Sequence, residues 1–126
     1  MDILDSMAIE FDIAKRNFRK ISLDEIKIDI NDKTKIYWIH SNLNQQDVFS
    51  NLVNKFQIPD DVVKLCNQED TIPKVIDTDD ALIVQVQCLL STELNEDNDV
   101  NFTNLVIYLT PHFCFTAATE SIPVLF

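Results

Sequence analysis

The sequence predicts an α+β fold, with a mixed, largely antiparallel sheet of six to seven strands and helices packed on it. Residues 44–56 and Asp60–Asn67 carry apolar side chains at helical spacing. Residues 81–90 and 102–118 are rich in Val, Ile, Leu and Phe, which is typical of strands inside a sheet. With 126 residues, the chain is expected to form a single domain, residues 1–126.

The N-terminal part is expected to begin with two paired strands. Apolar and acidic residues alternate along residues 8–13, which is the pattern of a strand with one face in water. Asn17–Ile21 can return as the second strand after a bend at Lys15 and Arg16. Residues 22–25 have the pattern of a capping box and predict a short helix, although residues 27–30 alternate like a strand.

Residues 36–39 are densely apolar and predict a buried strand before the first helix. Asn44 is expected to cap that helix, and Pro59 suits the start of the next one. Thr110, Pro111 and His112 predict a turn between two late strands. The expected apolar stripe of the first helix consists of Val48, Phe49, Leu52, Val53 and Phe56.

The chain contains no glycine. Loops that hold phosphate groups use glycine so that backbone N–H groups can approach the ligand. A P-loop and a Rossmann fingerprint are therefore excluded, and turns must use Asn, Asp and Pro instead.

The net charge of −11 is concentrated in one part of the chain. Residues 60–99 contain eleven acids and only two bases, Lys64 and Lys74, which gives a balance of −9. Such a surface repels nucleic acid and anionic lipid and attracts cations. The alternative interpretation is an acidic face that simply aids solubility.

Cys66, Cys88 and Cys114 share no metal-ligand spacing and indicate reduced thiols in a reducing compartment. The N-terminus lacks the features of a secretory signal, and the longest apolar runs of about five residues are far short of the roughly 20 that cross a bilayer. We expect this part of the chain to be soluble and to conduct no ion by itself.

His40 and His112 are the only histidines, and each is expected near a strand end. Neither has a second His, Cys or carboxylate at a local metal-ligand spacing, which favours structural roles. A nucleophile elbow requires glycine, so the sequence predicts no enzyme and no required cofactor. A small hydrolase that pairs one histidine with a carboxylate is the weakest alternative.

Two acidic clusters flank the long strand predicted at residues 82–90. Carboxylate oxygens are the ligands that Mg²⁺ prefers, so the clusters predict weakly bound Mg²⁺, with Asp60 and Asp61 behind them. A turn and an exposed loop are the alternative explanations of the two clusters. The candidate metal ligands are Asp77, Asp79, Asp80, Glu93, Glu96, Asp97 and Asp99.

Several short segments occur in a fixed order that resembles a known family. Tyr37-Trp38-Ile39-His40 precedes the first helix, Ile58-Pro59 opens the second, and Pro73-Lys74-Val75 precedes Asp79-Asp80. The late apolar strands and Pro123 complete the series. This order resembles the N-terminal cytoplasmic domain of the CorA family of divalent-cation transporters, including its zinc-handling ZntB branch.

The resemblance implies a regulatory, ion-sensing domain of a magnesium, cobalt or zinc transporter, without catalytic activity. It also implies a pentamer on the cytoplasmic face of the inner membrane, anchored by a stalk helix and membrane spans beyond Phe126. Lys64 and Leu65 stand where the family often has acids, so sensing of Mg²⁺ at that position is in doubt. The alternative is a free-standing acidic α+β module that binds a protein or peptide.

Overall fold

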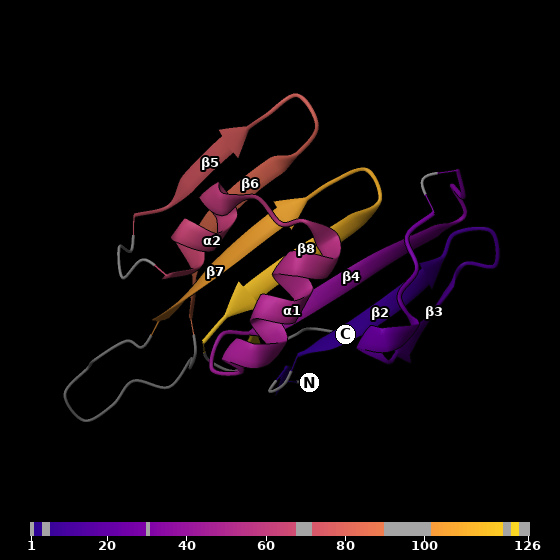
Figure 1. Ribbon diagram of the computed structural model, residues 1–126, viewed down its shortest axis with the longest axis horizontal. Helices are drawn as coiled ribbons and strands as arrows, with labels where there is room; N and C mark the ends of the chain where they lie inside the picture. The colour runs from indigo at the N-terminus through magenta and orange to yellow at the C-terminus, as the bar shows by residue number, and fades with distance from the viewer. Residues whose placement is uncertain are drawn as a thin grey trace.

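The computed structural model describes residues 2–3, 6–29, 31–67, 72–89, 102–119 and 122–123. A mixed sheet of seven strands has the order β3-β2-β4-β8-β7-β6-β5, and all its pairs are antiparallel except β4 with β8 (Figure 1). The predicted fold class is confirmed. The elements are β1 (Asp2–Ile3), β2 (Met7–Asp12), β3 (Asn17–Ile21), η1 (Leu23–Glu25), β4 (Lys35–Asn42), α1 (Gln46–Phe56), α2 (Asp60–Asn67), β5 (Lys74–Asp77), β6 (Leu82–Leu89), β7 (Phe102–Leu109), β8 (Phe113–Ala118) and β9 (Ile122–Pro123).

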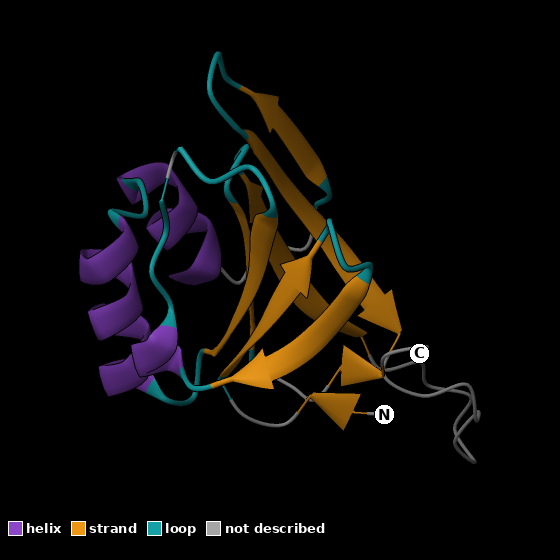
Figure 2. Ribbon diagram, turned by 90° about the vertical axis from the view of Figure 1, so that its right-hand side faces the viewer, coloured by secondary structure: helices purple, strands orange, loops and turns teal. Residues whose placement is uncertain are grey.

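Both α-helices lie on one side of the sheet (Figure 2). The predicted stripe of α1 packs as expected: Phe49 and Leu52 are buried, and its other three members pack against the core at partial burial. Because alternate residues of a strand share a face, the sheet residues of this core identify the helix-covered face. They are Ala8, Ile21, Tyr37, Ile39, Ile83, Val106, Phe113, Phe115 and Ala117.

The alternation of apolar and acidic residues along β2 does not leave its acidic face in water. Glu10 shares its face with Ala8, which belongs to the core, and is only 8% exposed. The expectation that Glu10 lies in water is therefore wrong. Ile9 is buried on the opposite face with Met7, where Phe11 packs at partial burial. The two faces of β2 thus pack in two different apolar clusters, one of them formed with Trp38 of β4.

Helix α1 begins at Gln46, not at Asn44. The side-chain amide of Asn44 donates a hydrogen bond to the carbonyl oxygen of Thr119 at 2.6 Å, and its backbone N–H donates to Asn42 Oδ1 at 2.9 Å. Asn44 therefore links the ends of β4 and β8 instead of capping the helix. Gln45 occupies the cap position without a side-chain cap bond.

The capping-box prediction is only partly correct. The Ser22 hydroxyl accepts from the backbone N–H of Asp24 at 3.3 Å, but a single 3₁₀ turn follows, Leu23–Glu25. The strand suggested for residues 27–30 is not formed at residues 27–29, and Ile30 lies outside the described residues. Lys74–Asp77 is in turn a strand that the sequence did not predict.

Two non-glycine residues adopt the left-handed backbone conformation that glycine usually supplies. Arg16 has φ of 54° at the bend between β2 and β3, as the predicted turn requires, and Gln57 has φ of 53° after α1. The backbone N–H of Gln57 bonds to the carbonyl of Val53 and ends the helix. A chain without glycine thus accepts steric cost at its tightest turns.

Replacing Leu52 with Ala is expected to reduce the free energy of unfolding by about 2–5 kcal/mol, because this side chain is buried between α1 and the sheet. Chemical denaturation monitored by circular dichroism measures the change. Asn51→Ala, on the exposed side of the same turn, is the matched control and should change stability by less than about 0.5 kcal/mol. Equal effects of the two substitutions would contradict the packing of α1.

Candidate functional site

The acids at the entry to β6 lie in the turn between β5 and β6. Asp77 ends β5, Asp79 and Asp80 form the bend, and all three are exposed. The turn is held by Thr78, whose hydroxyl donates to the carbonyl oxygen of Ala81 at 2.9 Å and accepts from its N–H at 3.0 Å. Thr78 therefore makes the side-chain hydrogen bonds of the turn that were expected of the aspartates.

The other predicted metal ligands do not complete a site with these acids in the described part of the chain. Asp60 and Asp61 are exposed in the first turn of α2. Within the described ranges, no three His, Cys, Asp or Glu side chains are grouped so that they could hold a metal ion. The remaining predicted ligands, Glu93, Glu96, Asp97 and Asp99, lie outside the described residues. The metal assignment stays a prediction.

A buried hydrogen-bonded chain lies on the sheet face opposite the helices. Trp38 Nε1 donates to Thr116 Oγ1 at 2.8 Å, and His40 Nδ1 lies 2.8 Å from the same oxygen. The indole N–H can only donate, so Thr116 can give its own proton to His40 Nδ1, which places the imidazole proton on Nε2. No local pattern indicates this contact, because 76 residues separate His40 from Thr116.

His40 is 2% exposed, and burial lowers the pKa of its imidazole to about 4. The ring is therefore neutral at pH 7. Its Nδ1 is occupied by a hydroxyl group and not by a carboxylate, which is the arrangement of a structural histidine. The predicted structural role of His40 agrees with this geometry.

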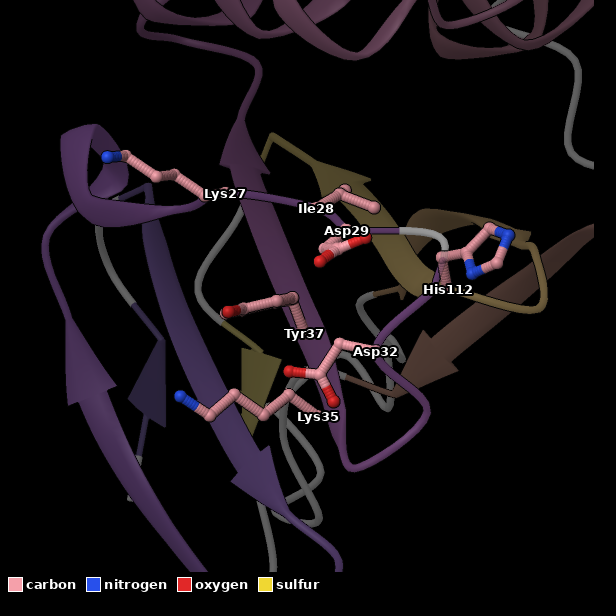
Figure 3. A pocket seen from close by; sticks show the side chains of 7 residues that line it. All are labelled: Lys27, Ile28, Asp29, Asp32, Lys35, Tyr37 and His112. Atoms are coloured by element: carbon pink, nitrogen blue, oxygen red, sulfur yellow. The ribbon is translucent and has the colours of Figure 1, made fainter.

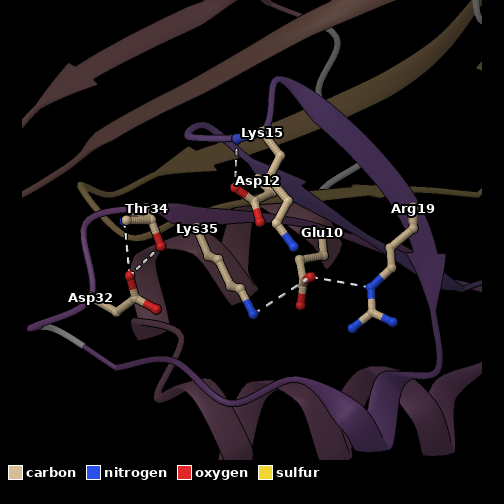
Figure 4. Close-up of polar contacts among 7 residues, drawn as sticks. All are labelled: Glu10, Asp12, Lys15, Arg19, Asp32, Thr34 and Lys35. Atoms are coloured by element: carbon tan, nitrogen blue, oxygen red, sulfur yellow. Dashed lines mark hydrogen bonds and ion pairs between the residues drawn. The ribbon is translucent and has the colours of Figure 1, made fainter.

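A second polar group is the buried carboxylate of Glu10, on the helix-covered face (Figure 4). Its Oε1 lies 3.2 Å from Arg19 Nε and 3.9 Å from Lys35 Nζ. The hydrogen bond to this carboxylate raises the pKa of the Arg19 guanidinium. Burial raises the pKa of the Tyr37 phenol, and the charge of Glu10 adds to that effect. The Glu10 carboxylate is thus paired with two cationic side chains, an arrangement that holds β2 to β3 and β4.

His112 lies beside a small cavity that is also lined by Lys27, Ile28, Asp29, Asp32, Lys35 and Tyr37 (Figure 3). The cavity has a volume of about 20 Å³, which is room for about one water molecule. A more open depression of about 300 Å³ adjoins it and shares Asp32, Lys35 and His112. Lysines line both hollows, which disfavours a divalent cation there, and the smaller one is too small for the substrate of a hydrolase.

Cys66 and Cys114 are free thiols. Burial raises the pKa of the Cys66 thiol to about 12 and also raises that of Cys114. A buried thiol with a raised pKa is a poor nucleophile and a poor metal ligand, because both functions require the thiolate. The side chain of Cys88 lies outside the described residues.

No protein-family model matches this sequence, and no curated protein matches it by sequence. Solved structures do match it. Full-length CmaX protein superimposes with a TM-score of 0.72 at 13% identity, over 94% of this chain and 36% of that one. The ZntB cytoplasmic domain from Vibrio parahaemolyticus RIMD 2210633 gives 0.64 at 13% identity, over 96% and 46%. The CorA magnesium transporter from Methanocaldococcus jannaschii gives 0.64 at 20% identity, over 93% and 33%.

These likenesses show that the chain has the fold of CorA-type cytoplasmic domains, and they confirm the resemblance found in the sequence at the level of the fold. The chain spans 33% to 46% of the length of these three proteins. None of its described helices is long and apolar enough to cross a membrane.

The buried position of His40 predicts a pH-dependent contribution to stability. The unfolded chain binds the imidazole proton near pH 6.5 and the folded chain near pH 4, so protons favour unfolding between these values. The buried neutral imidazole of His40 makes its full contribution to the free energy of unfolding above about pH 6.5. This contribution is lost as the pH falls towards 4, and the total loss is about 3 kcal/mol.

The test is to measure the free energy of unfolding of the native chain and of His40→Gln between pH 4 and 7. The carboxylates titrate in both proteins, so the difference between the two free energies reports the His40 imidazole. The difference should change by about 1.4 kcal/mol per pH unit. An NMR titration that placed the His40 pKa at 6 or above would contradict the argument.

Proposed function

We propose that this chain is the cytoplasmic domain of a CorA-like divalent metal-ion transporter and that it regulates the transporter in response to cations. The single observation that carries the proposal is the superposition of nearly the whole chain on CorA-type domains. In this proposal the domain has no catalytic activity, lies on the cytoplasmic side of the membrane and assembles as a homo-oligomer, with the pentamer as the expected form.

The outer face of the sheet supports a role inside a larger assembly. On β7, Val106 and Tyr108 pack against the helix layer, so Leu105 and Ile107 point to the other side. Val84 on β6 lies opposite Ile107 in register and shares that face. All three are only half-buried, and no described helix covers them (Figure 2). Half-buried apolar side chains on a sheet face without a helix layer are typical of packing against another segment or chain.

The acidic surface supplies the proposed response to cations. The exposed acids of α2 and of the β5–β6 turn repel one another, and divalent cations reduce that repulsion. Lys64 is exposed on α2 and adds a positive charge beside Asp60 and Asp61, so binding there is expected to be weak. Cations at a boundary between acidic subunits would favour one packing of the ring, and their removal would favour another.

The complete reading frame that encodes this chain provides the decisive test. A CorA-like transporter requires membrane spans after residue 126, and the purified product in liposomes should take up Mg²⁺, Co²⁺ or Zn²⁺ in a fluorescence assay. Deleting residues 1–126 should leave uptake measurable and abolish its dependence on internal cation. A stop codon directly after residue 126 would favour the alternative, an acidic binding module.

Mg²⁺ is expected to associate weakly with the domain, in the millimolar range of sites without an oxygen cage. Mg²⁺ and Ca²⁺ should therefore raise the melting temperature modestly and to a similar degree. Asp79→Asn combined with Asp80→Asn should reduce this rise more than Asp24→Asn combined with Asp47→Asn, a control with the same change of charge outside residues 60–99. A stoichiometric micromolar Mg²⁺ site in titration calorimetry would overturn the weak-binding part of the proposal.

A further inference from the structure

Strand β3 and the turn before it form a basic edge of the seven-stranded sheet (Figure 1). Residues 13–20, here called the basic edge, are all exposed. They contain four bases and no acid, in a chain whose net charge is −11. The basic edge therefore differs in the sign of its charge from the molecule as a whole. Its bases are Lys15, Arg16, Arg19 and Lys20.

The acids of the neighbouring strand β2 are engaged by contacts within the domain (Figure 4). Glu10 Oε1 lies 3.2 Å from Arg19 Nε. Asp12 Oδ1 accepts a hydrogen bond from the backbone N–H of Lys15 at 3.0 Å. Apart from Arg19, the bases of the basic edge make no ion pair within the described ranges. Three positive charges are thus available to a partner.

Two large apolar side chains are exposed among these charges. Ile13 is 51% and Phe18 is 61% exposed. Lysines on an edge strand protect it from pairing with other strands, but that protection does not explain exposed apolar residues beside them. Phe18 lies opposite Phe11 in register, so it projects on the sheet face away from the helices. Basic and apolar groups side by side suit a partner that is both acidic and apolar.

The backbone of β3 offers a second means of recognition. Among the described strands β3 pairs with β2 alone, and alternate residues of an edge strand direct their N–H and C=O groups away from the sheet. An extended peptide can add to such an edge through main-chain hydrogen bonds. A lipid surface or a nucleic acid cannot form this ladder, and the net charge of −11 repels both. These properties favour an extended peptide as the partner.

The opposite edge of the sheet carries the other sign of charge. Strand β5 and the turn after it contain the acids Asp77, Asp79 and Asp80 and one base, Lys74. That edge repels an acidic peptide, whereas the basic edge attracts it. Charge therefore selects β3 and not β5 for such a partner.

We infer that the basic edge binds an extended acidic segment of another protein, which adds to β3 as a further strand. Lys20 shares the face of Phe18, and Lys15 and Arg16 lie beyond the other end of β3. The matching segment carries an apolar side chain opposite Phe18 and an acid two residues away on each side. The inference goes beyond the proposed function, because it involves neither a metal ion nor the membrane, and either can fail without the other.

Fluorescence anisotropy with a labelled synthetic peptide tests the binding. The probe is a short capped peptide in which Val is flanked by Glu two residues away on each side, with Thr at the other positions. It should bind the native chain with a Kd below about 1 mM at about 0.1 M salt. Binding should weaken at about 1 M salt, where the Debye length falls from roughly 10 to 3 Å. No binding at about 1 mM overturns the inference, as does equal binding of a peptide with Lys in place of Glu.

Methylation of the peptide's backbone nitrogens tests whether it adds as a strand. In an added strand, the N–H groups of alternate residues point towards β3. Two further peptides are each methylated on one alternate set of nitrogens. One of them should bind about tenfold more weakly than the unmodified peptide, and the other should bind about equally well. Equal binding of all three would show contact through side chains alone and would contradict strand addition.

Substitutions in the chain locate the surface. Lys15→Glu with Lys20→Glu should weaken peptide binding about tenfold or more. Lys27→Glu with Lys64→Glu is the matched control, because it changes the net charge by the same amount at exposed positions outside the basic edge. It should leave binding within about twofold of the native chain. Circular dichroism melts confirm that each variant is folded. Equal effects of the two double variants would place the peptide elsewhere.

Phe18→Ala tests the apolar part of the site without a change of charge. It should weaken binding about fivefold, whereas Val75→Ala, which removes an apolar side chain that is 70% exposed on the opposite edge, should have no effect. Amide shifts in an NMR titration should be confined to residues 13–20 and the facing strand β2. Equal effects of the two substitutions, or shifts centred on β5, would contradict the assignment.

The other possible occupants of the basic edge are tested directly. Vesicles that contain phosphatidylserine and a short single-stranded RNA should bind more weakly than the peptide. If either binds as tightly and Lys15→Glu with Lys20→Glu abolishes that binding, the basic edge recognises anions in general and the inference is wrong. Sedimentation velocity tests a second copy of the chain as the occupant. Self-association that the same double variant abolishes, and that the peptide does not displace, would also overturn the inference.

Discussion

The parallel pairing of β4 with β8 is the constraint on which the rest of the structure depends. Parallel neighbours cannot be joined by a tight turn, so the chain must leave β4, pass through other elements and return. In this protein the return includes both α-helices and three strands. The helices cover one face of the sheet on the way, and β7 and β6 extend it beyond β8. The crossover therefore sets the helix layer, the strand order from β4 to β5 and the edge formed by β5.

The same pairing creates the polar interior. Strand β4 brings Trp38 and His40 beside Thr116 of β8, and one hydroxyl group satisfies both ring nitrogens that face it. Glu10 on β2 is neutralised by charges on its two neighbouring strands, Arg19 and Lys35. These buried hydrogen bonds and ion pairs connect neighbouring strands. What remains for function is the surface: an acidic turn, an open apolar face and two unlike edges.

This distribution of polar and apolar groups fits the proposed role within a larger assembly. The two hollows beside His112 are both lined by lysines, and the smaller one has room for about one water molecule. A sheet with a helix layer on one side buries its own core and still leaves its second face for a neighbour. In the proposed transporter domain, cations would act by reducing repulsion between acidic subunits, without a deep site in any one of them.

The sequence by itself determined the class of fold, helix α2, the stripe of α1 and most of the strands. These depend on local periodicity and turn chemistry, which neighbouring residues carry. It could not determine that Glu10 is buried, that Asn44 ties β4 to β8 instead of capping α1, or that Lys74–Asp77 is an edge strand. The acids Asp77, Asp79 and Asp80 were visible in the sequence, but the sequence did not show that Thr78 holds their turn. Only the tertiary structure decides such matters, because they depend on which distant segments become neighbours, and local pattern does not encode that.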